Sequence, residues 1–211
     1  MSSKDTYHHG DLRRELMDAA LRVLASEGLA GLSLRAVASA CGVSHAAPYH
    51  HFADKAALVR ALGFEGLRVL DERMAAAESA AGADPGERLI AIGTAYVLFA
   101  AESPAYFTAM SAPEMRAPHA PDVAEEHGET WERLLRAVVA CQETRELAPN
   151  DPMLLAAGLW ALVQGLAQLW TSGPLSELPQ AADGLPALAD AVIRSMFAGM
   201  RPAPGDAYAA L

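Results

Sequence analysis

Apolar residues recur three and four positions apart along almost the whole of this 211-residue chain, and that spacing limits its fold more than any other feature. The spacing places apolar side chains on one face of an α-helix, whereas a half-buried strand needs strict alternation of apolar and polar residues. No run of alternating β-branched and polar residues is long enough to predict a strand. The sequence therefore predicts an all-α protein of about nine helices.

Capping residues divide this helical pattern into elements. Gly28 ends the first predicted helix, because glycine readily takes the left-handed conformation at a helix C-terminus. Ser33 caps a second helix that stops at Gly42, and Ser44 caps a third over about residues 45–51. The remaining helices are predicted to begin near Asp54, Asp84, Ser103, Asp122, Asp151 and Pro186.

Residues 32–52 form the most informative segment of the chain. Two short predicted helices separated by a turn that contains glycine are the pattern of a helix-turn-helix unit. That unit needs a small residue where the helices touch, supplied by Ala38, and a turn glycine, supplied by Gly42. Its remaining apolar contacts fall to Val37, Cys41 and Val43. A DNA-binding unit is therefore expected near the N-terminus.

The segment resembles the signature of the TetR/AcrR family of bacterial regulators, over residues 10–65. The resemblance is carried by Ala38-x-x-x-Gly42-Val43-Ser44, Tyr49-x-His51-Phe52 and Asp54-Lys55-x-x-Leu58. It implies a DNA-binding domain at residues 1–55, followed at residues 56–211 by a helical domain that binds an effector and dimerises. The expected protein is a regulator, most simply a repressor that a small molecule releases from a palindromic operator in double-stranded DNA.

The same resemblance implies roles for individual residues of the helix-turn-helix. Facing the bases of the major groove would be Ser44, His45, Ala46 and Ala47. Holding phosphates would be Ser33, Tyr49, His51 and Lys55. The chemistry agrees in part, because a lysine in the first turn of a helix opposes the helix dipole and is better explained by an anionic partner. Pro48 should distort the recognition helix, because proline lacks a backbone N–H and strains the turn before it.

Charge is distributed in a way that permits DNA binding. Residues 1–66 hold seven Lys/Arg and seven Asp/Glu, so the formal net charge of −10 lies entirely in the remainder of the chain. Five of the seven histidines also lie in that first segment. A modest phosphate-binding face is therefore possible at the N-terminus.

The second half of the chain has an excess of aromatic and apolar residues on helices whose counterparts in the family enclose a ligand cavity. The predicted effector pocket consists of Tyr96, Phe99, Phe107, Met110, His127, Trp131, Leu135, Trp160, and Gln164. As a group these residues favour a small, mostly apolar effector, although each alone is more often plain core. The run from Trp160 to Gly165 is similar to the Trp-His-Gly element of one subgroup, with Gln164 where that subgroup has histidine.

The last two predicted helices are apolar around more of their circumference than one core requires. A helix that is apolar on two faces must bury both, which predicts a homodimer interface. The predicted interface residues are Leu159, Val163, Leu166, Val192 and Met196.

Other classes of protein fit the sequence less well. Cys41 and Cys141 stand alone, with no CxxC spacing, so we expect reduced cysteines, no metal site and no cofactor. No catalytic motif such as GxSxG or HExxH is present, so we expect no enzyme. The polar start of the chain and the interrupted apolar run at 153–170 predict a cytoplasmic protein with no membrane partner. The alternative is a helical small-molecule or lipid-binding protein without DNA binding, which would leave residues 32–58 unexplained.

Overall fold

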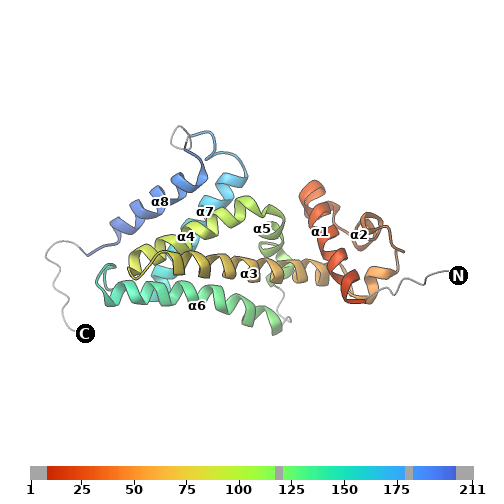
Figure 1. The fold of residues 1–211 in the computed structure, drawn as a ribbon, viewed down its shortest axis with the longest axis horizontal. Helices are drawn as coiled ribbons and strands as arrows, with labels where there is room; N and C mark the ends of the chain where they lie inside the picture. Colours follow the sequence, from red (N-terminus) through yellow and green to blue (C-terminus); the bar gives the residue numbers. More distant parts are fainter. Residues whose placement is uncertain (1–8, 117–120, 179–182, 203–211) are drawn as a thin grey trace. The chain divides into compact units, whose positions relative to one another are not determined.

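The computed structural model describes residues 9–116, 121–178 and 183–202, and all regular secondary structure in these residues is helical, without a strand (Figure 1). The all-α prediction is confirmed. The elements, in chain order, are α1 (His9–Gly31), α2 (Leu34–Cys41), the 3-10 helix η1 (Ala47–His50), α3 (Lys55–Ala80), α4 (Pro85–Glu102), α5 (Pro104–Met110), the 3-10 helix η2 (Pro113–Arg116), α6 (Pro121–Glu143), α7 (Pro152–Thr171) and α8 (Leu185–Gly199).

Eight of the nine predicted helices are α-helices in the described part of the chain, and the third is not. The predicted α-helix over 45–51 is instead the short 3-10 helix η1. Gly28, the expected end of the first helix, has φ 67° and interrupts α1 there, although three further helical residues follow. As predicted, the side chains of Asp84 and Asp151 cap the starts of α4 and α7. They accept hydrogen bonds from the backbone N–H groups of Glu87 and Met153.

The chain divides into two compact units, which interleave along the sequence. Unit 1 comprises residues 1–66 and 104–123, and unit 2 comprises residues 67–103 and 124–211. Helix α3 contributes its first half to unit 1 and its second half to unit 2. The functional division predicted at residue 55 stays a prediction. The compact units differ from it because α5 packs against α1 and so belongs with unit 1.

Unit 1 is built on a core of α1, α2 and the start of α3. Leu16, Val37 and Leu58 are completely buried in it. Two glycines on α3 let methionines approach its backbone. A Cβ at Gly63 would overlap the Met115 side chain, and one at Gly66 would crowd Met110 and Tyr106. These glycines therefore keep α3 close to α5 and the segment that follows it.

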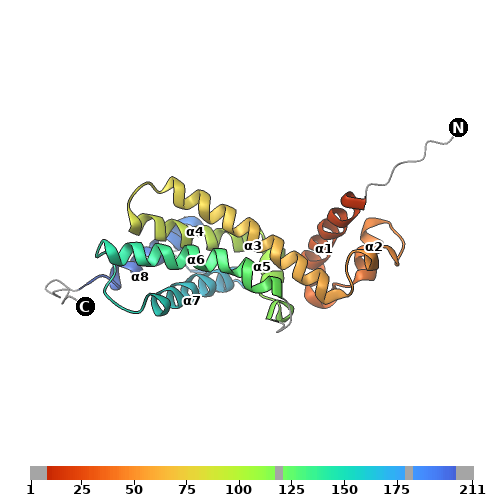
Figure 2. The ribbon, with the colours of Figure 1, turned by 90° about the horizontal axis from the view of Figure 1, so that it is seen from below.

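Unit 2 is a bundle in which α4 packs against both α7 and α8 (Figure 2). Gly93 on α4 allows this approach, since a Cβ there would already meet Val163 and Ile193 at 3.3 Å. Charged side chains tie other helices together. Arg133 on α6 bonds both oxygens of Asp71 at 3.0 and 3.1 Å and also bonds Glu78 at 2.6 Å, and all three side chains are mostly shielded from solvent.

Candidate DNA interface and effector region

Helix α2 is capped at both ends by the residues that the sequence indicated. The Ser33 hydroxyl accepts the Ala36 N–H at 3.1 Å. At the other end Gly42 has φ 69°, a left-handed conformation that glycine takes without strain, and its N–H bonds back to Ser39. The Val43 N–H then bonds to the Ala38 carbonyl at 3.0 Å. These bonds fix the sharp turn that leads out of α2.

The segment after this turn is a 3-10 helix because of Pro48, which lies within its first two positions. Proline has no N–H to donate and its ring crowds the preceding turn, so the α-helical bonding pattern cannot extend through it. The bonds observed are three residues apart, from Ala47 to Ser44, from Tyr49 to Ala46 and from His51 to Pro48. The Ser44 side chain therefore does not cap an α-helix as predicted, and Ala46 occupies the capping position.

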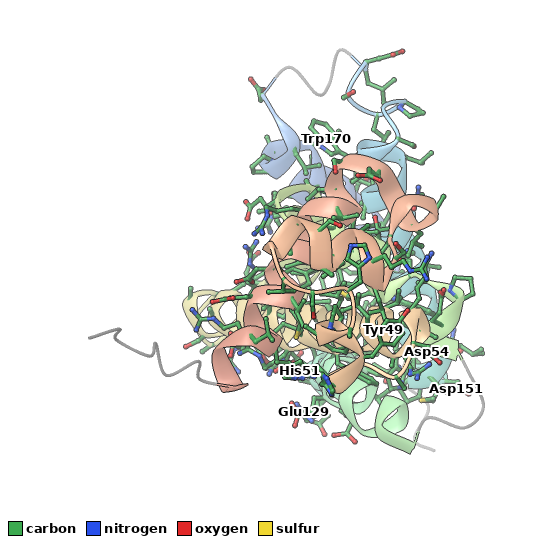
Figure 3. All side chains as sticks on the ribbon, turned by 90° about the vertical axis from the view of Figure 1, so that its right-hand side faces the viewer. Tyr49, His51, Asp54, Glu129, Asp151 and Trp170 are labelled. Atoms are coloured by element: carbon green, nitrogen blue, oxygen red, sulfur yellow. The ribbon has the colours of Figure 1, made fainter. Side chains whose placement is uncertain are left out.

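The side chains predicted to read DNA differ in exposure. Ser44, His45 and Ala46 are exposed, and Tyr49 is 54% exposed. Half-buried are Ser33, Ala47, His51 and Lys55. Figure 3 looks onto this unit and labels Tyr49, His51 and Asp54 around the η1 turn. The helix-turn-helix thus places a row of unobstructed side chains in one short segment, which we call the recognition segment (residues 44–51).

Two exposed residues in this region were missed by sequence reasoning. His50 ends η1 and is exposed, and Arg35 is exposed in the first turn of α2. The contacts implied by the family resemblance gave neither residue a role, and a 3-10 turn arranges its side chains differently from an α-helix.

The buried side of the recognition segment is anchored by Phe52. Phe52 is 3% exposed, and its N–H bonds to the Pro48 carbonyl at 2.9 Å. The Arg13 guanidinium lies over the ring, with Cζ 5.3 Å from the centroid. Helix α1 therefore supports the segment from behind.

Lys55 has a structural partner. Its ammonium donates to the carbonyl oxygen of Leu29, just after the interruption of α1 at Gly28. The hydrogen bond to this carbonyl can explain why a lysine occurs in the first turn of α3, without an anionic partner. An ammonium has three donors, so two remain for a phosphate.

The residues of the predicted effector pocket fall in different units. Unit 2 holds Tyr96, Phe99, Trp131, Leu135, Trp160 and Gln164. Unit 1 holds Phe107 and Met110. His127 is on α6, and its side chain lies outside the described residues.

Four of the unit 2 residues form one connected cluster. The Trp160 indole N–H donates to the Tyr96 hydroxyl, which in turn donates to Oε1 of Gln164. The Trp131 and Trp160 rings meet edge to face, with centroids 6.4 Å apart. Burial raises the pKa of Tyr96 to about 12, so this hydroxyl is a neutral donor at physiological pH. The hydroxyl orients the Gln164 amide so that its NH₂ group is left to donate elsewhere.

Two buried hydroxyls of unit 2 lack a protein partner. Neither Thr94 Oγ1 on α4 nor Thr130 Oγ1 on α6 has a hydrogen bond within the described residues. Buried polar atoms are nearly always paired, so an unpaired one requires a specific explanation such as a ligand or water. Trp160 is also 51% exposed despite its ring contact with Trp131.

The predicted dimer residues divide between the interior and the surface of the protomer. Leu159, Val163 and Leu166 are buried within unit 2, which leaves little of their side chains for a second copy. Val192 is half-buried and Met196 is 48% exposed. A helical pattern marks both faces of α7 as apolar but cannot say which one the protomer itself covers.

The outward side of α7 is a different set of residues, which we call the outer α7 face. It consists of Leu154, Gly158, Ala161, Gly165 and Leu169. A Cβ at either glycine would meet nothing within 4 Å. Helix α7 is long and apolar enough to cross a membrane by length and composition, and only 28% of its most apolar window is buried in the protomer. These apolar residues are therefore expected to be buried against another molecule.

The described residues contain no cluster of three or more His, Cys, Asp or Glu side chains that could hold a metal ion. Cys41 and Cys141 are both free, as expected, and burial raises the pKa of Cys141 to about 12. Both thiols therefore behave as packing groups.

Two family models match most of the chain. Residues 16–62 match the family model described as bacterial regulatory proteins, tetR family. Residues 89–196 match the model described as tetracyclin repressor-like, C-terminal domain. A curated relative in Paraburkholderia xenovorans, the HTH-type transcriptional regulator BetI, is 31% identical over 176 residues, which cover 79% of this chain and 84% of the relative.

Solved structures show the same fold. A Rhodococcus protein of unknown function is 32% identical, covers 94% of this chain and all of its own, and superposes with a TM-score of 0.80. AibR, solved in complex with isovaleryl coenzyme A and operator DNA, gives a TM-score of 0.69 at 20% identity, over 88% of this chain and 98% of that one.

Proposed function

Since the chain belongs to the TetR family of bacterial regulatory proteins and is a DNA-binding transcriptional regulator, we propose that it is a repressor that a small, mostly apolar effector releases from a palindromic operator. The observation that carries the DNA-binding half of this proposal is the recognition segment. Its side chains are exposed beyond a tightly capped turn, on a unit that matches the family model.

The recognition segment would enter the major groove. Ser44, His45 and Ala46 are the exposed residues nearest the turn, and His45 can exchange hydrogen bonds with a base edge. Ala47 would lie beside them. Phosphates would be held by Ser33, Tyr49, His51 and Lys55, around the ends of α2 and α3.

Binding to DNA can be tested with the region upstream of the protein's own gene. A fluorescent duplex of that region should bind more tightly than an unrelated duplex of equal length, as measured by anisotropy. His45→Ala should change preference at one or two base pairs per half-site, by roughly 1 to 3 kcal/mol. Equal affinity of the wild-type protein for the two duplexes would contradict the proposal that the upstream region contains an operator.

Homodimers are typical of this family, and we assign the dimer contact to the outer α7 face together with Met196 on α8. The two open glycines of that face would let a second helix approach closely, and Leu154 and Leu169 would be buried by it. A palindromic operator then matches the two-fold symmetry of the dimer.

Two leucines on α7 provide a matched test of this interface. Leu169 is 47% exposed and Leu166 is 8% exposed in the protomer. Leu169→Glu should give folded monomers by light scattering and circular dichroism, whereas Leu166→Glu should unfold the protomer itself. Val139→Glu, at an exposed position on α6, is the control and should remain dimeric. A dimeric Leu169→Glu protein would contradict this assignment.

The effector is proposed to contact the cluster of Tyr96, Trp131, Trp160 and Gln164. The half-exposed Trp160 ring offers an apolar surface, while the Gln164 NH₂ and the unpaired Thr94 and Thr130 hydroxyls offer polar contacts. This favours an uncharged apolar body with a hydrogen-bonding group. Phe99, His127 and Leu135, which belong to the same unit, remain proposed members of the site.

Release from DNA by an effector can be tested through reciprocity. Uncharged probes with an apolar body, such as branched and straight-chain alcohols and amides, would be titrated with and without the duplex, and binding would be followed by tryptophan fluorescence. Isovaleryl coenzyme A, the molecule bound by AibR, serves as the charged comparison. A ligand that releases DNA must bind more weakly when DNA is present, by the same factor, typically ~5 to 150-fold. Identical affinity in the two titrations would contradict induction.

No catalytic role is proposed, and the comparisons favour a regulator over an enzyme. We further propose that the protein works in the cytoplasm, with a second copy rather than lipid covering α7. The alternative, a helical small-molecule or lipid carrier without DNA binding, is less well supported because it leaves the capped helix-turn-helix without a use.

A further inference from the structure

The helix-turn-helix of this protein has few permanently charged cations and several histidines. Residues 36–54 contain no lysine and no arginine, and their only groups able to become cationic are His45, His50 and His51. The nearest fixed cations in sequence are Arg35 and Lys55. Lys55 already donates to the Leu29 carbonyl. The part of the chain that must approach a polyanion therefore relies on imidazoles.

These imidazoles are free to respond to an external partner. His45 and His50 are exposed, and His51 is half-buried. Within the described residues no hydrogen bond or ion pair engages any of the three side chains. The backbone of the segment is nevertheless held in place, by the 3-10 bonds of η1 and by the buried Pro48 and Phe52.

Other charged or titratable groups near the segment do not replace the histidines. Those on the elements around it are Arg13, Glu15, Asp18 and Arg22 on α1, Arg35 and Cys41 on α2, and Tyr49, Asp54 and Lys55 beside η1. Asp54 is occupied by the Ala57 N–H at 2.7 Å, and Arg13 lies over Phe52. Burial raises the pKa of Cys41. Carboxylates, guanidiniums, phenols and such a thiol keep their charge constant between pH 6 and 8.

Histidine is the side chain whose ordinary pKa, about 6.5, lies in that range. A phosphate within a few ångströms stabilises the imidazolium and so raises that pKa in the complex. A histidine that is neutral in the free protein then takes up a proton when DNA binds. We propose that His45, His50 and His51 hold operator phosphates as imidazoliums, so that DNA binding by this protein is coupled to proton uptake.

This inference rests on the proposed function and adds His50 to its contacts. It assigns His45 to a phosphate in place of the base edge proposed above. The two roles are distinguishable because a neutral imidazole that bonds a base edge takes up no proton. Acidification should therefore strengthen binding to any duplex through the phosphates, whereas base reading would strengthen only the matching sequence.

The experiment measures the affinity of the full-length protein for two duplexes of equal length, the upstream region and a scrambled sequence, from pH 6 to 8 at constant ionic strength. Each proton taken up changes affinity by up to about tenfold per pH unit. With two protomers we expect a gain of at least about a hundredfold from pH 8 to pH 6 on both duplexes. The salt dependence should also be steeper at pH 6, because more cations then neutralise phosphates.

Variants separate this coupling from other causes. His45→Gln with His50→Gln should remove most of the pH dependence while circular dichroism stays unchanged. His45→Arg with His50→Arg should restore tight binding at pH 8 and leave only the smaller pH dependence that His51 contributes. His119→Gln, 68 residues beyond the recognition segment in the sequence, is the control and should retain the full dependence.

The outcomes are distinguishable. Wild-type binding of equal affinity at pH 6 and 8 would overturn the coupling and leave the proposed function intact. A double glutamine variant with an unchanged pH dependence would likewise overturn it. No binding to either duplex at any pH would overturn the proposed function and this inference with it.

Discussion

The two compact units treat their polar side chains in opposite ways. In unit 1 the recognition segment points Ser44, His45 and His50 into solvent without partners among the described residues. In unit 2 polar groups are paired across helices, as in the contacts of Arg133 with Asp71 and Glu78. Arg194 on α8 similarly bonds Glu87 on α4 with both of its terminal nitrogens, at 2.6 and 2.7 Å.

This difference follows from what each unit must contact. Solvated groups keep their bonds to water until another molecule replaces it, so an unpaired surface residue is available at little cost. Paired groups instead fix the positions of helices that are distant in sequence. Unit 1 is therefore built to present side chains, and unit 2 to hold its own helices in a defined arrangement.

The largest expected effect is on the pairing of unit 2. Arg133→Met would leave two carboxylates without their cation in a setting where the side chains are 17 to 30% exposed. We expect a loss of ~2 to 4 kcal/mol in the free energy of unfolding, measured by urea denaturation. Arg136→Met, three residues along α6, removes an exposed pair with Glu132 and should cost less than ~0.5 kcal/mol. Equal losses for the two variants would show that burial does not strengthen the Arg133 contacts.

Two glycines with similar left-handed backbone conformations test whether the units are functionally separate. Gly42 in unit 1 and Gly82 in unit 2 have φ of 69° and 82°, and a Cβ at either position would meet nothing within 4 Å. Alanine at each should lower stability by ~1 to 2 kcal/mol, because an L-residue is strained there. Only Gly42→Ala should also weaken DNA binding, because it distorts the turn before the recognition segment. An equal loss of DNA affinity from Gly82→Ala would contradict that separation.

Tyr96→Phe tests a neutral contact within unit 2. Removal of the hydroxyl leaves the Trp160 N–H and Gln164 Oε1 without their bond and should cost ~1 kcal/mol at pH 7. The pKa of Tyr96 is raised to about 12, so its stabilisation is complete below the ordinary value near 10 and is lost as pH rises toward 12. The stability difference between wild type and variant should therefore shrink over that range.

Cys141 is the control for this pH dependence. Burial raises the pKa of Cys141 to about 12 as well, so ionisation of this thiol also lowers stability at high pH. The Tyr96 comparison should thus be made in a Cys141→Ala background. A difference between tyrosine and phenylalanine that stayed constant from pH 9 to 12 would contradict the assigned pKa.

Lys55 is expected to have a similarly small effect, and it both bonds within the protein and remains available to a phosphate. Lys55→Met removes the bond to the Leu29 carbonyl and should cost ~0.5 to 1.5 kcal/mol in stability. If its other donors also hold phosphate, the slope of affinity against salt should fall by ~2 for a dimer. An unchanged slope would leave Lys55 with a structural role alone.

Most helix boundaries could be predicted from the sequence because capping is local chemistry. Ser33, Gly42, Asp84 and Asp151 act within three or four residues of themselves, so their roles do not depend on the rest of the fold. The third helix was the exception. Pro48 was recognised as a source of distortion, but an α-helix was still predicted where the structure has a 3-10 turn.

Tertiary choices could not be predicted in the same way. Periodicity marked α7 as apolar on two sides, yet the structure decides that Leu166 faces inward and Leu169 outward. The partner of Lys55 lies 26 residues away, and the partner of Tyr96 lies 68 residues away. Such contacts follow from how helices pack, which spacing along one helix does not specify.

The recognition segment has a consequence for how such a protein can change over generations. Its fold rests on the buried residues Pro48 and Phe52 and on backbone bonds, whereas Ser44, His45, Ala46 and His50 are exposed. Mutations at those outward positions therefore alter what the surface recognises without a stability cost to be compensated elsewhere. Duplicated copies of the gene can diverge toward new operators one substitution at a time, and every intermediate remains folded.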